Sequence, residues 1–243
     1  MSTLIKRISS KNHAPISDRV WLFDLDNTIH DASHAIFDQI NNSMTRAVMN
    51  ALKLSFEQAT QLRQRYWEKY GATMIGMHKH HGVNALKFLH ASHHFDVAKY
   101  VKHQPRLRYL LNNTPGKKYV VTNAPYDYAL TVLETLGVKE CFEGICAIDH
   151  MCIHGHYRPK PSMKLMRGLL KELNCPAKNI VLVEDTLKNL KAAKQLGMQC
   201  AHIFNIGTPF SAIYDGRPSY VDIKKHSIQA LLLSDFARYP SSC

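Results

Sequence analysis

A run of four apolar residues, at positions 20 to 23, ends directly at Asp24-Leu25-Asp26-Asn27-Thr28. Such a run is typical of a strand that is buried on both faces, as in a sheet covered by helices. The carboxyl end of this kind of strand borders the crevice in which open α/β sheets bind ligands. We therefore expect Asp24 and Asp26 in a site where a cation or a proton neutralises their like charges. Taken alone, the same residues also fit a strand that ends in an Asx turn.

Strand and helix patterns alternate through the second half of the chain, which predicts an α/β fold with a doubly wound parallel sheet. We expect strands over residues 118–122, 145–149, 180–183 and 200–204, and helices over residues 126–136, 161–173, 186–196 and 227–236.

Residues 33–111 instead have helical spacing, with helices expected around residues 36–48, 56–70, 85–89 and 97–101. This segment interrupts the chain between the first strand and the rest of the sheet. We therefore predict a catalytic core formed by residues 1–31 and 115–243 and an inserted helical cap domain over residues 32–114. Both crossings lie beside the expected site, so the insertion can act as a lid.

Composition limits what the chain binds. The first nineteen residues contain no apolar segment of a signal peptide, and no apolar run approaches the roughly 20 residues that span a bilayer, so we expect a cytoplasmic protein without a membrane partner. The six cysteines form no C-x-x-C pair, which argues against a zinc knuckle or a redox dithiol. The net charge of +12 suits nucleic acid, an anionic membrane or a small phosphorylated substrate. Because the basic residues are dispersed, a solvated basic surface is favoured over a nucleic-acid site.

Two further motifs place polar residues beside apolar segments. Thr122 and Asn123 directly follow an apolar strand, where by themselves they also fit a helix N-cap and a turn residue. Lys160 lies between two prolines, which restrict the backbone on both sides of it. A lysine held in this way suits a fixed cation beside a transferred phosphate, although most lysines only face solvent.

Adjacent carboxylates, Glu184 and Asp185, end the apolar run at positions 181 to 183. By themselves they also fit a favourable interaction with the dipole of the following helix. Because the first aspartate pair already requires a cation, we expect Asp185 to be a further carboxylate at a metal ion, with Glu184 at or near it. Oxygen ligands of this kind favour Mg²⁺ over zinc.

In this order, the four motifs resemble those of the haloacid dehalogenase superfamily, whose members are mostly phosphatases. The resemblance implies a Rossmann-like core and a two-step phosphoryl transfer through an aspartyl-phosphate on Asp24. Asp26 would act as general acid for the leaving group and then as base for water. Thr122 and Lys160 would stabilise charge on the phosphate. The implied ligands of Mg²⁺ are Asp24, Asp26, Glu184 and Asp185.

The second aspartate also separates the branches of that superfamily. Asp26 argues against a true dehalogenase, because the dehalogenase branch does not carry this residue. The segment Tyr66-Trp67-Glu68-Lys69-Tyr70-Gly71, followed by Met74-Ile75-Gly76-Met77, is similar to the pyrimidine 5'-nucleotidase branch, which acts on nucleoside monophosphates such as UMP and CMP. The alternative for these aromatic and methionine side chains is the core of the helical bundle. The residues expected to bind the substrate are Thr28, His30 and Asn123, with His30 bordering the leaving group.

We thus expect a Mg²⁺-dependent phosphatase of small phosphomonoesters, most specifically of pyrimidine nucleoside monophosphates. The alternatives are a phosphatase of a sugar phosphate, FMN or pyridoxal phosphate, and a phosphomutase. A further alternative is a basic nucleic-acid-binding protein with a vestigial hydrolase fold. The presence of all the expected catalytic residues argues against it. The run His78-Lys79-His80-His81 fits a solvated turn better than a contact with phosphate or base. The sequence does not indicate an oligomeric state.

Overall fold

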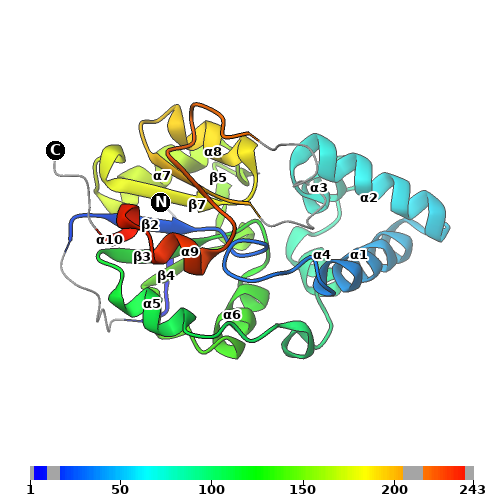
Figure 1. Cartoon of the computed structure of the whole chain (residues 1–243). Coiled ribbons are helices and arrows are strands. Elements are labelled where there is room, and N and C mark those ends of the chain that lie inside the picture. Colours follow the sequence, from blue (N-terminus) through cyan, green and yellow to red (C-terminus); the bar gives the residue numbers. More distant parts are fainter. Residues whose placement is uncertain (1–2, 10–16, 205–215, 239–243) are drawn as a thin grey trace.

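A seven-stranded, mostly parallel sheet forms the centre of the molecule (Figure 1). The computed structural model describes residues 3–9, 17–204 and 216–238. In sheet order the strands are β1 (Lys6–Arg7), β4 (Gly144–Cys146), β3 (Lys117–Val121), β2 (Val20–Phe23), β7 (Ile180–Glu184), β8 (Gln199–Ile203) and β9 (Ile223–Lys225). Strand β1 is antiparallel to β4, and the other neighbours are parallel. The predicted α/β fold with a doubly wound parallel sheet is confirmed.

Strand β2 is buried because helices cover both faces of the sheet. Successive side chains of a strand point to opposite faces. Trp21 and Phe23 pack in a hydrophobic cluster with helices α5, α6 and α9, whereas Val20 and Leu22 pack in a cluster with α7 and α8 (Figure 1). These five helices are α5 (Leu107–Asn113), α6 (Tyr126–Thr135), α7 (Met163–Leu173), α8 (Leu187–Lys194) and α9 (Ile228–Leu232). Burial on both faces explains why the strand is an uninterrupted apolar run.

Four helices project beyond one end of the sheet (Figure 1). They are α1 (Ile36–Leu52), α2 (Phe56–Tyr70), α3 (Thr73–His81) and α4 (Ala85–Ser92). Together they enclose a separate hydrophobic cluster that includes Val48, Tyr66, Met77 and Phe88. The interpretation of Tyr66 and Met77 as bundle core is therefore confirmed, whereas Trp67 is 47% exposed.

The predicted cap range also contains two elements that pack on the sheet. Val97 of the short 3-10 helix η1 (Val97–Tyr100) and Leu107 and Leu111 of α5 belong to the cluster around β2. Helix α5 is absent from the sequence prediction, and the helix expected at residues 97–101 is a single 3-10 turn. The division at residues 32–114 stays a prediction.

Several other elements differ from their predicted extents. The strand expected over residues 145–149 ends at Cys146 and is followed by the 3-10 helix η3 (Ile148–His150). The expected terminal helix is divided into α9 and α10 (Asp235–Arg238). Two further 3-10 helices are η2 (Lys139–Cys141) and η4 (Ala177–Asn179). Strands β1 and β9 and the hairpin of β5 (Cys152–Ile153) and β6 (His156–Tyr157) escape prediction because two or three residues carry too little apolar pattern.

The histidine-rich run is helical, so the predicted turn is wrong. His78 to His81 form the last turn of α3. The Tyr66 hydroxyl lies 2.7 Å from Nε2 of His81, and the Tyr70 hydroxyl lies 2.6 Å from Nε2 of His80. These bonds join the end of α3 to α2. Tyr66 and Tyr70 are four residues apart, so they lie on the same face of α2 and both reach α3.

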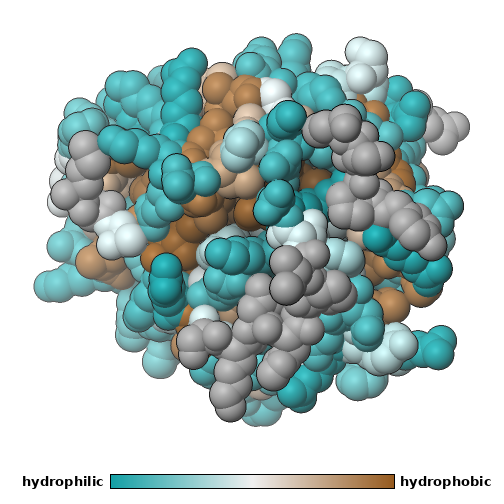
Figure 2. All heavy atoms as spheres, turned by 90° about the vertical axis from the view of Figure 1, so that its left-hand side faces the viewer, coloured by the Kyte–Doolittle hydropathy of each residue, from teal (hydrophilic) through white to brown (hydrophobic). Residues whose placement is uncertain are grey.

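The end of the molecule remote from α1 to α3 carries mainly hydrophilic atoms, crossed by a band of hydrophobic ones (Figure 2). Within the described part of the chain, no helix combines the length and apolar character required to cross a membrane.

Candidate active site

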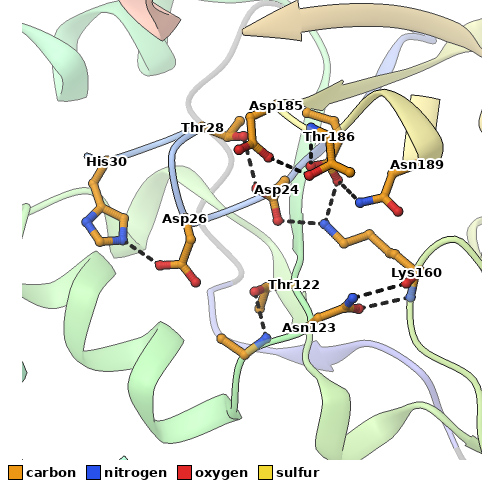
Figure 3. Close-up of polar contacts among 12 residues, drawn as sticks. Asp24, Asp26, Thr28, His30, Thr122, Asn123, Lys160, Asp185, Thr186 and Asn189 are labelled. Carbon is orange, nitrogen blue, oxygen red and sulfur yellow. Dashed lines mark hydrogen bonds and ion pairs between the residues drawn. The ribbon is translucent and has the colours of Figure 1, made fainter. Parts of the chain in front are cut away.

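The carboxyl ends of β2, β3 and β7 meet at one edge of the sheet, where the candidate residues lie (Figure 3). Phe23 of β2 pairs with Val120 of β3 on one side and with Val183 of β7 on the other. Because the strands are parallel and in this register, the residues that follow them emerge side by side. The strand ends thus bring three of the four motifs together, and Lys160, which precedes α7, joins them through its bonds to Asp24 and Glu184.

Asp24 has both carboxylate oxygens bound by side chains. Oδ1 accepts a hydrogen bond from Nζ of Lys160 at 2.6 Å, and Oδ2 accepts one from the hydroxyl of Thr28 at 2.9 Å. The backbone N–H of Asp24 donates to the carbonyl of Val183 at 2.9 Å. Asp24 is 7% exposed. Its carboxylate is therefore fixed in orientation while part of it remains accessible.

Lys160 is the cation of the site. Its Nζ also donates to Oε2 of Glu184 at 2.7 Å, and the residue is 2% exposed. Asn123 fixes the lysine backbone, because its side-chain oxygen accepts from the Lys160 N–H at 2.9 Å and its amide donates to the Lys160 carbonyl at 3.1 Å. Burial by itself lowers the pKa of Lys160, but the carboxylates of Asp24 and Glu184 raise it above its usual value. The lysine is charged in the folded protein.

Both carboxylate oxygens of Glu184 accept hydrogen bonds. Oε2 accepts from Lys160 and from Nδ2 of Asn189 at 2.9 Å, and Oε1 accepts from the backbone N–H of Thr186 at 3.1 Å. Burial by itself raises the pKa of Glu184, but Lys160 and the hydrogen bonds hold it below its usual value. Glu184 therefore supplies a permanent negative charge next to the lysine.

An acidic group of Asp24, Glu184 and Asp185 can hold a metal ion, since one oxygen from each lies within 4.8 Å of the others. The three carboxylates face one lysine, which leaves a formal excess of two negative charges. Burial and the neighbouring carboxylates raise the pKa of Asp24 to about 7 and the pKa of Asp185 to about 9. A divalent cation would relieve this repulsion, and the all-oxygen donor set suits Mg²⁺.

Asp26 is not part of this acidic group, although the sequence also placed it at the metal. Its Oδ1 instead accepts from the hydroxyl of Tyr128 at 2.6 Å and lies 3.0 Å from Nε2 of His30. His30 and Tyr128 are 2% and 3% exposed. The ring of His30 therefore meets the site through Asp26 (Figure 3), and its predicted contact with substrate stays a prediction.

Tyr128 is a site residue that sequence reasoning missed. It lies six residues after Thr122, in the first turn of α6, and points back to the end of β2. Thr122 does not cap this helix, because its hydroxyl accepts from the N–H of Ala124 at 3.0 Å and α6 begins at Tyr126. The N-cap interpretation of Thr122 is therefore wrong. The hydroxyl of Thr28 and the side chain of Asn123 are engaged with Asp24 and Lys160, and their predicted substrate contacts are untested.

Helix α2 reaches this site at its C-terminal end. Gly71 follows the helix with a φ of +76°, a left-handed conformation that favours glycine. A β-carbon at this position would lie 3.4 Å from the backbone carbonyl oxygen of Lys160. The C-terminal end of α2 therefore lies against the segment that carries the lysine.

A sequence model of haloacid dehalogenase-like hydrolases matches residues 21–203, which include every motif described above. The chain belongs to the haloacid dehalogenase-like hydrolases. The phosphate metabolism protein 8 of Saccharomyces cerevisiae is 23% identical over 236 residues, covering 91% of this chain and 71% of that protein.

Solved structures of haloacid dehalogenase-like proteins share the fold. A phosphatase from Thermococcus onnurineus superposes with a TM-score of 0.58 at 18% identity, covering 88% of this chain and 95% of that one. CbbY from Rhodobacter sphaeroides, in complex with phosphate, superposes with a TM-score of 0.58 at 19% identity, covering 86% of this chain and 94% of that one. The L-2-haloacid dehalogenase from Xanthobacter autotrophicus superposes with a TM-score of 0.53 at 14% identity, covering 88% of this chain and 96% of that one. At these identities the likeness establishes the fold, and the choice of reaction depends on the site residues.

Mg²⁺ is expected to stabilise this hydrolase more at about pH 8.5 than at about pH 5.5. Folding raises the pKa of Asp24 and Asp185 from 3.8 to about 7 and about 9, so the folded, metal-free protein holds protons that the unfolded chain releases above about pH 4. The stability from these two groups is complete below that pH and is lost as the pH rises through 7 and 9. A bound cation replaces the missing protons. Thermal unfolding midpoints with and without millimolar Mg²⁺ at both pH values test this.

Asp185→Asn is the informative variant for that experiment. With a folded pKa of about 9, Asp185 must either take up a proton on folding at about pH 8.5 or stay ionised beside Asp24 and Glu184. The amide does neither, so the metal-free midpoint at about pH 8.5 should rise, and the response to Mg²⁺ should be lost because a ligand is missing. Asp38→Asn, at an exposed position in the first turn of α1, is the matched control. Equal Mg²⁺ shifts at both pH values, or an undiminished shift in Asp185→Asn, would contradict the assignment.

Proposed function

We propose that the protein is a Mg²⁺-dependent phosphomonoesterase that acts through an aspartyl-phosphate on Asp24. The observation that carries this proposal is the arrangement around Asp24: a fixed carboxylate, a charged lysine on one oxygen, the carboxylates of Glu184 and Asp185 with an oxygen within 4.8 Å, and Asp26 outside this acidic group. A nucleophile, a cation for phosphate and a carboxylic acid that can exchange a proton are the parts that this reaction requires.

The reaction proceeds in two balanced steps. In the first, a carboxylate oxygen of Asp24 attacks phosphorus, the bond from phosphorus to the leaving oxygen breaks, and Asp26 gives that oxygen a proton. In the second, water attacks phosphorus, Asp26 takes a proton from the water, and the bond between Asp24 and phosphorus breaks. One water is consumed, and the products are an alcohol and inorganic phosphate.

Lys160 and Thr122 bind the oxygens of the transferring phosphate. The ammonium group of a lysine has three N–H donors, and two of those of Lys160 are directed at Asp24 and Glu184. No described residue accepts from the third, which leaves it for a phosphate oxygen. Mg²⁺, held by Asp24 and Asp185 with Glu184 beside them, would supply further positive charge against the phosphate.

Pyrimidine nucleoside 5'-monophosphates are the proposed substrates. The cytoplasm is the proposed location of the protein. A cavity of about 690 Å³ lies between α4 and α6, and Tyr128, the partner of Asp26, lines it. Its volume falls within the range of small-molecule sites, and the rings of His90, His93 and Phe95 offer faces for a base. We propose that residues 32–114 act as a cap over this substrate, with Thr28, His30 and Asn123 at the substrate end of the core.

The test is phosphate release from a panel of esters. UMP, CMP, AMP, a hexose phosphate, xylulose 1,5-bisphosphate, FMN and pyridoxal phosphate are compared with Mg²⁺ and with EDTA. We expect kcat/KM for UMP and CMP to exceed the other values by roughly tenfold or more, because a pocket that hydrogen-bonds one base rejects analogues that leave its polar groups unpaired. The Asp24→Asn variant serves as the blank.

Each other outcome corrects a different part of the proposal. CbbY has been crystallised with xylulose 1,5-bisphosphate, so preference for a sugar phosphate would retain the chemistry and replace the substrate class. Isomerisation of a sugar phosphate without net phosphate release would indicate a mutase. Activity that persists in EDTA would exclude the metal requirement.

A further inference from the structure

The partners of Asp26 distinguish its two oxygens. Both hydrogen bonds described for its carboxylate end at Oδ1, from Tyr128 at 2.6 Å and from His30 at 3.0 Å. The two partners are buried, whereas the side chain of Asp26 is 20% exposed. The buried side of the carboxylate is therefore anchored at Oδ1, and Oδ2 remains for the open side.

The loop after β2 brings His30 back over Asp26. The N–H groups of Thr28, Ile29 and His30 all turn toward the carbonyl of Leu25, at 2.9 to 3.3 Å. Asn27 has a left-handed φ of 60°, and its side-chain oxygen accepts from the N–H groups of Ala32 and Ser33 at 3.1 and 3.0 Å. This closed loop holds the His30 ring against Asp26, and the His30 side chain has no exposed surface.

The hydrogen bonds also define the state of the His30 ring. Nδ1 is buried and has no hydrogen-bond partner among the residues that the structure describes. A proton on Nδ1 would be a buried donor without an acceptor, which is costly, so the ring carries its proton on Nε2 and donates it to Asp26. Two donors therefore converge on one oxygen of the aspartate.

Tyr128 is held as rigidly as His30. Its ring lies in the hydrophobic cluster that covers the sheet, and the ring of His93 packs against it edge-on at 5.6 Å. Burial, followed by the charge of Asp26, raises the pKa of Tyr128 well above its usual value, so the hydroxyl keeps its proton and acts as a donor.

We propose that Tyr128 and His30 are positioning residues that fix Asp26 through Oδ1 and thereby present Oδ2 to the leaving oxygen. This inference rests on the proposed phosphomonoesterase activity. With Oδ1 accepting two hydrogen bonds, the proton of the neutral carboxylic acid resides on Oδ2. Oδ2–H is then directed at the open side, gives its proton as the ester bond breaks, and regains one from water in the second step.

The test compares esters that differ in their need for that proton. The oxygen that leaves UMP is strongly basic and must be protonated, whereas p-nitrophenolate leaves readily without a proton. For Tyr128→Phe we expect kcat/KM to fall about 10- to 100-fold with UMP and less than about threefold with p-nitrophenyl phosphate. This loss is part of the roughly 10²- to 10⁴-fold that a positioned general acid contributes, because Asp26 itself and its bond to His30 are retained. The ratio kcat/KM reports the step in which the leaving group departs. His30→Leu should show the same pattern, and His30→Gln, which retains an N–H donor, should recover part of the loss.

Tyr126→Phe, on the same helix with its ring against His150, is the matched control and should leave both values unchanged. Thermal unfolding midpoints establish that all variants are folded. If the panel favours another alkyl phosphate, that ester replaces UMP.

Equal losses on both esters, or no loss on either, in Tyr128→Phe and His30→Leu would overturn the positioning role while leaving the proposed function intact. A wild-type protein that hydrolyses neither ester nor any member of the panel would instead overturn the proposed function itself, and the positioning role with it.

Discussion

Asp24→Asn is expected to lower kcat for phosphate release by roughly 10⁴-fold or more, because the amide cannot form an acyl phosphate at a useful rate. The variant should fold at least as well as the wild type. Folding raises the pKa of Asp24 to about 7, so the ionised carboxylate is destabilised in its buried place and a neutral isostere relieves that repulsion. Rapid-quench experiments with a ³²P-labelled ester should trap label on wild-type protein in the peptide that contains Asp24 and none on the variant.

The control for this result is Asp38→Asn, which makes the same chemical change on the exposed face of α1 and should retain full activity. Hydrolysis in ¹⁸O-water adds a second criterion. Attack of water on phosphorus places the label in inorganic phosphate, whereas attack on the carboxyl carbon, as in hydrolysis of an alkyl ester of Asp24, places it in the protein. Activity of Asp24→Asn within about tenfold of wild type would exclude Asp24 as the nucleophile.

Lys160→Met is expected to remove activity and also to destabilise the protein by about 3–5 kcal/mol, the usual effect of removing one partner from a buried ion pair. Lys160 is 2% exposed and lies 2.6 Å from Asp24 and 2.7 Å from Glu184, so its loss leaves both carboxylates buried without a counter-charge. Without the lysine the pKa of both carboxyl groups rises, that of Glu184 from below its usual value and that of Asp24 from about 7, and protonation removes the repulsion. The loss in free energy of unfolding should therefore be large near pH 8 and smaller near pH 5, as measured by urea denaturation in EDTA.

Lys164→Met, at an exposed position four residues further along the chain, is the matched control and should change stability little. The double variant Lys160→Met/Glu184→Gln tests the cause, because it removes one of the stranded charges. Its stability should lie well above that of Lys160→Met alone. If the double variant is no more stable, or if the loss does not depend on pH, the effect of Lys160 is one of packing and not of charge.

The order of the motifs was sufficient to place the candidate carboxylates at the ends of strands. Asp24, Thr122 and Glu184 each follow an apolar run, and this pattern is local: a strand buried on both faces has no polar residue until it ends. Parallel strands end at one edge, so the side chains that follow them come together whatever the details of packing. The same reasoning failed for β1, β9 and the β5–β6 hairpin, whose few residues carry no such pattern.

Helix spacing predicted most helices, but not where they pack. Helix α5 lies within the predicted cap range, yet Leu107 and Leu111 bury against the sheet. His80 and His81 were expected in a turn, but they continue α3, where they hydrogen-bond to the tyrosines of α2. In both cases tertiary contacts outweighed local preference, which is worth only tenths of a kcal/mol per residue.

The sequence by itself determined the α/β class, the ends of the central strands, the carboxylates and threonine at those ends, and the lysine between two prolines, because these depend on residues that are close in the chain. The tertiary structure alone decided the partners within the site. Lys160 lies 136 residues from Asp24, and Tyr128 lies 102 residues from Asp26. It decided that Glu184 binds the lysine and that Asp26 turns to Tyr128 and His30, away from the acidic group. A hydrogen bond requires two groups within about 3 Å at a suitable angle, and only the packing of strands and helices from distant parts of the chain sets such distances.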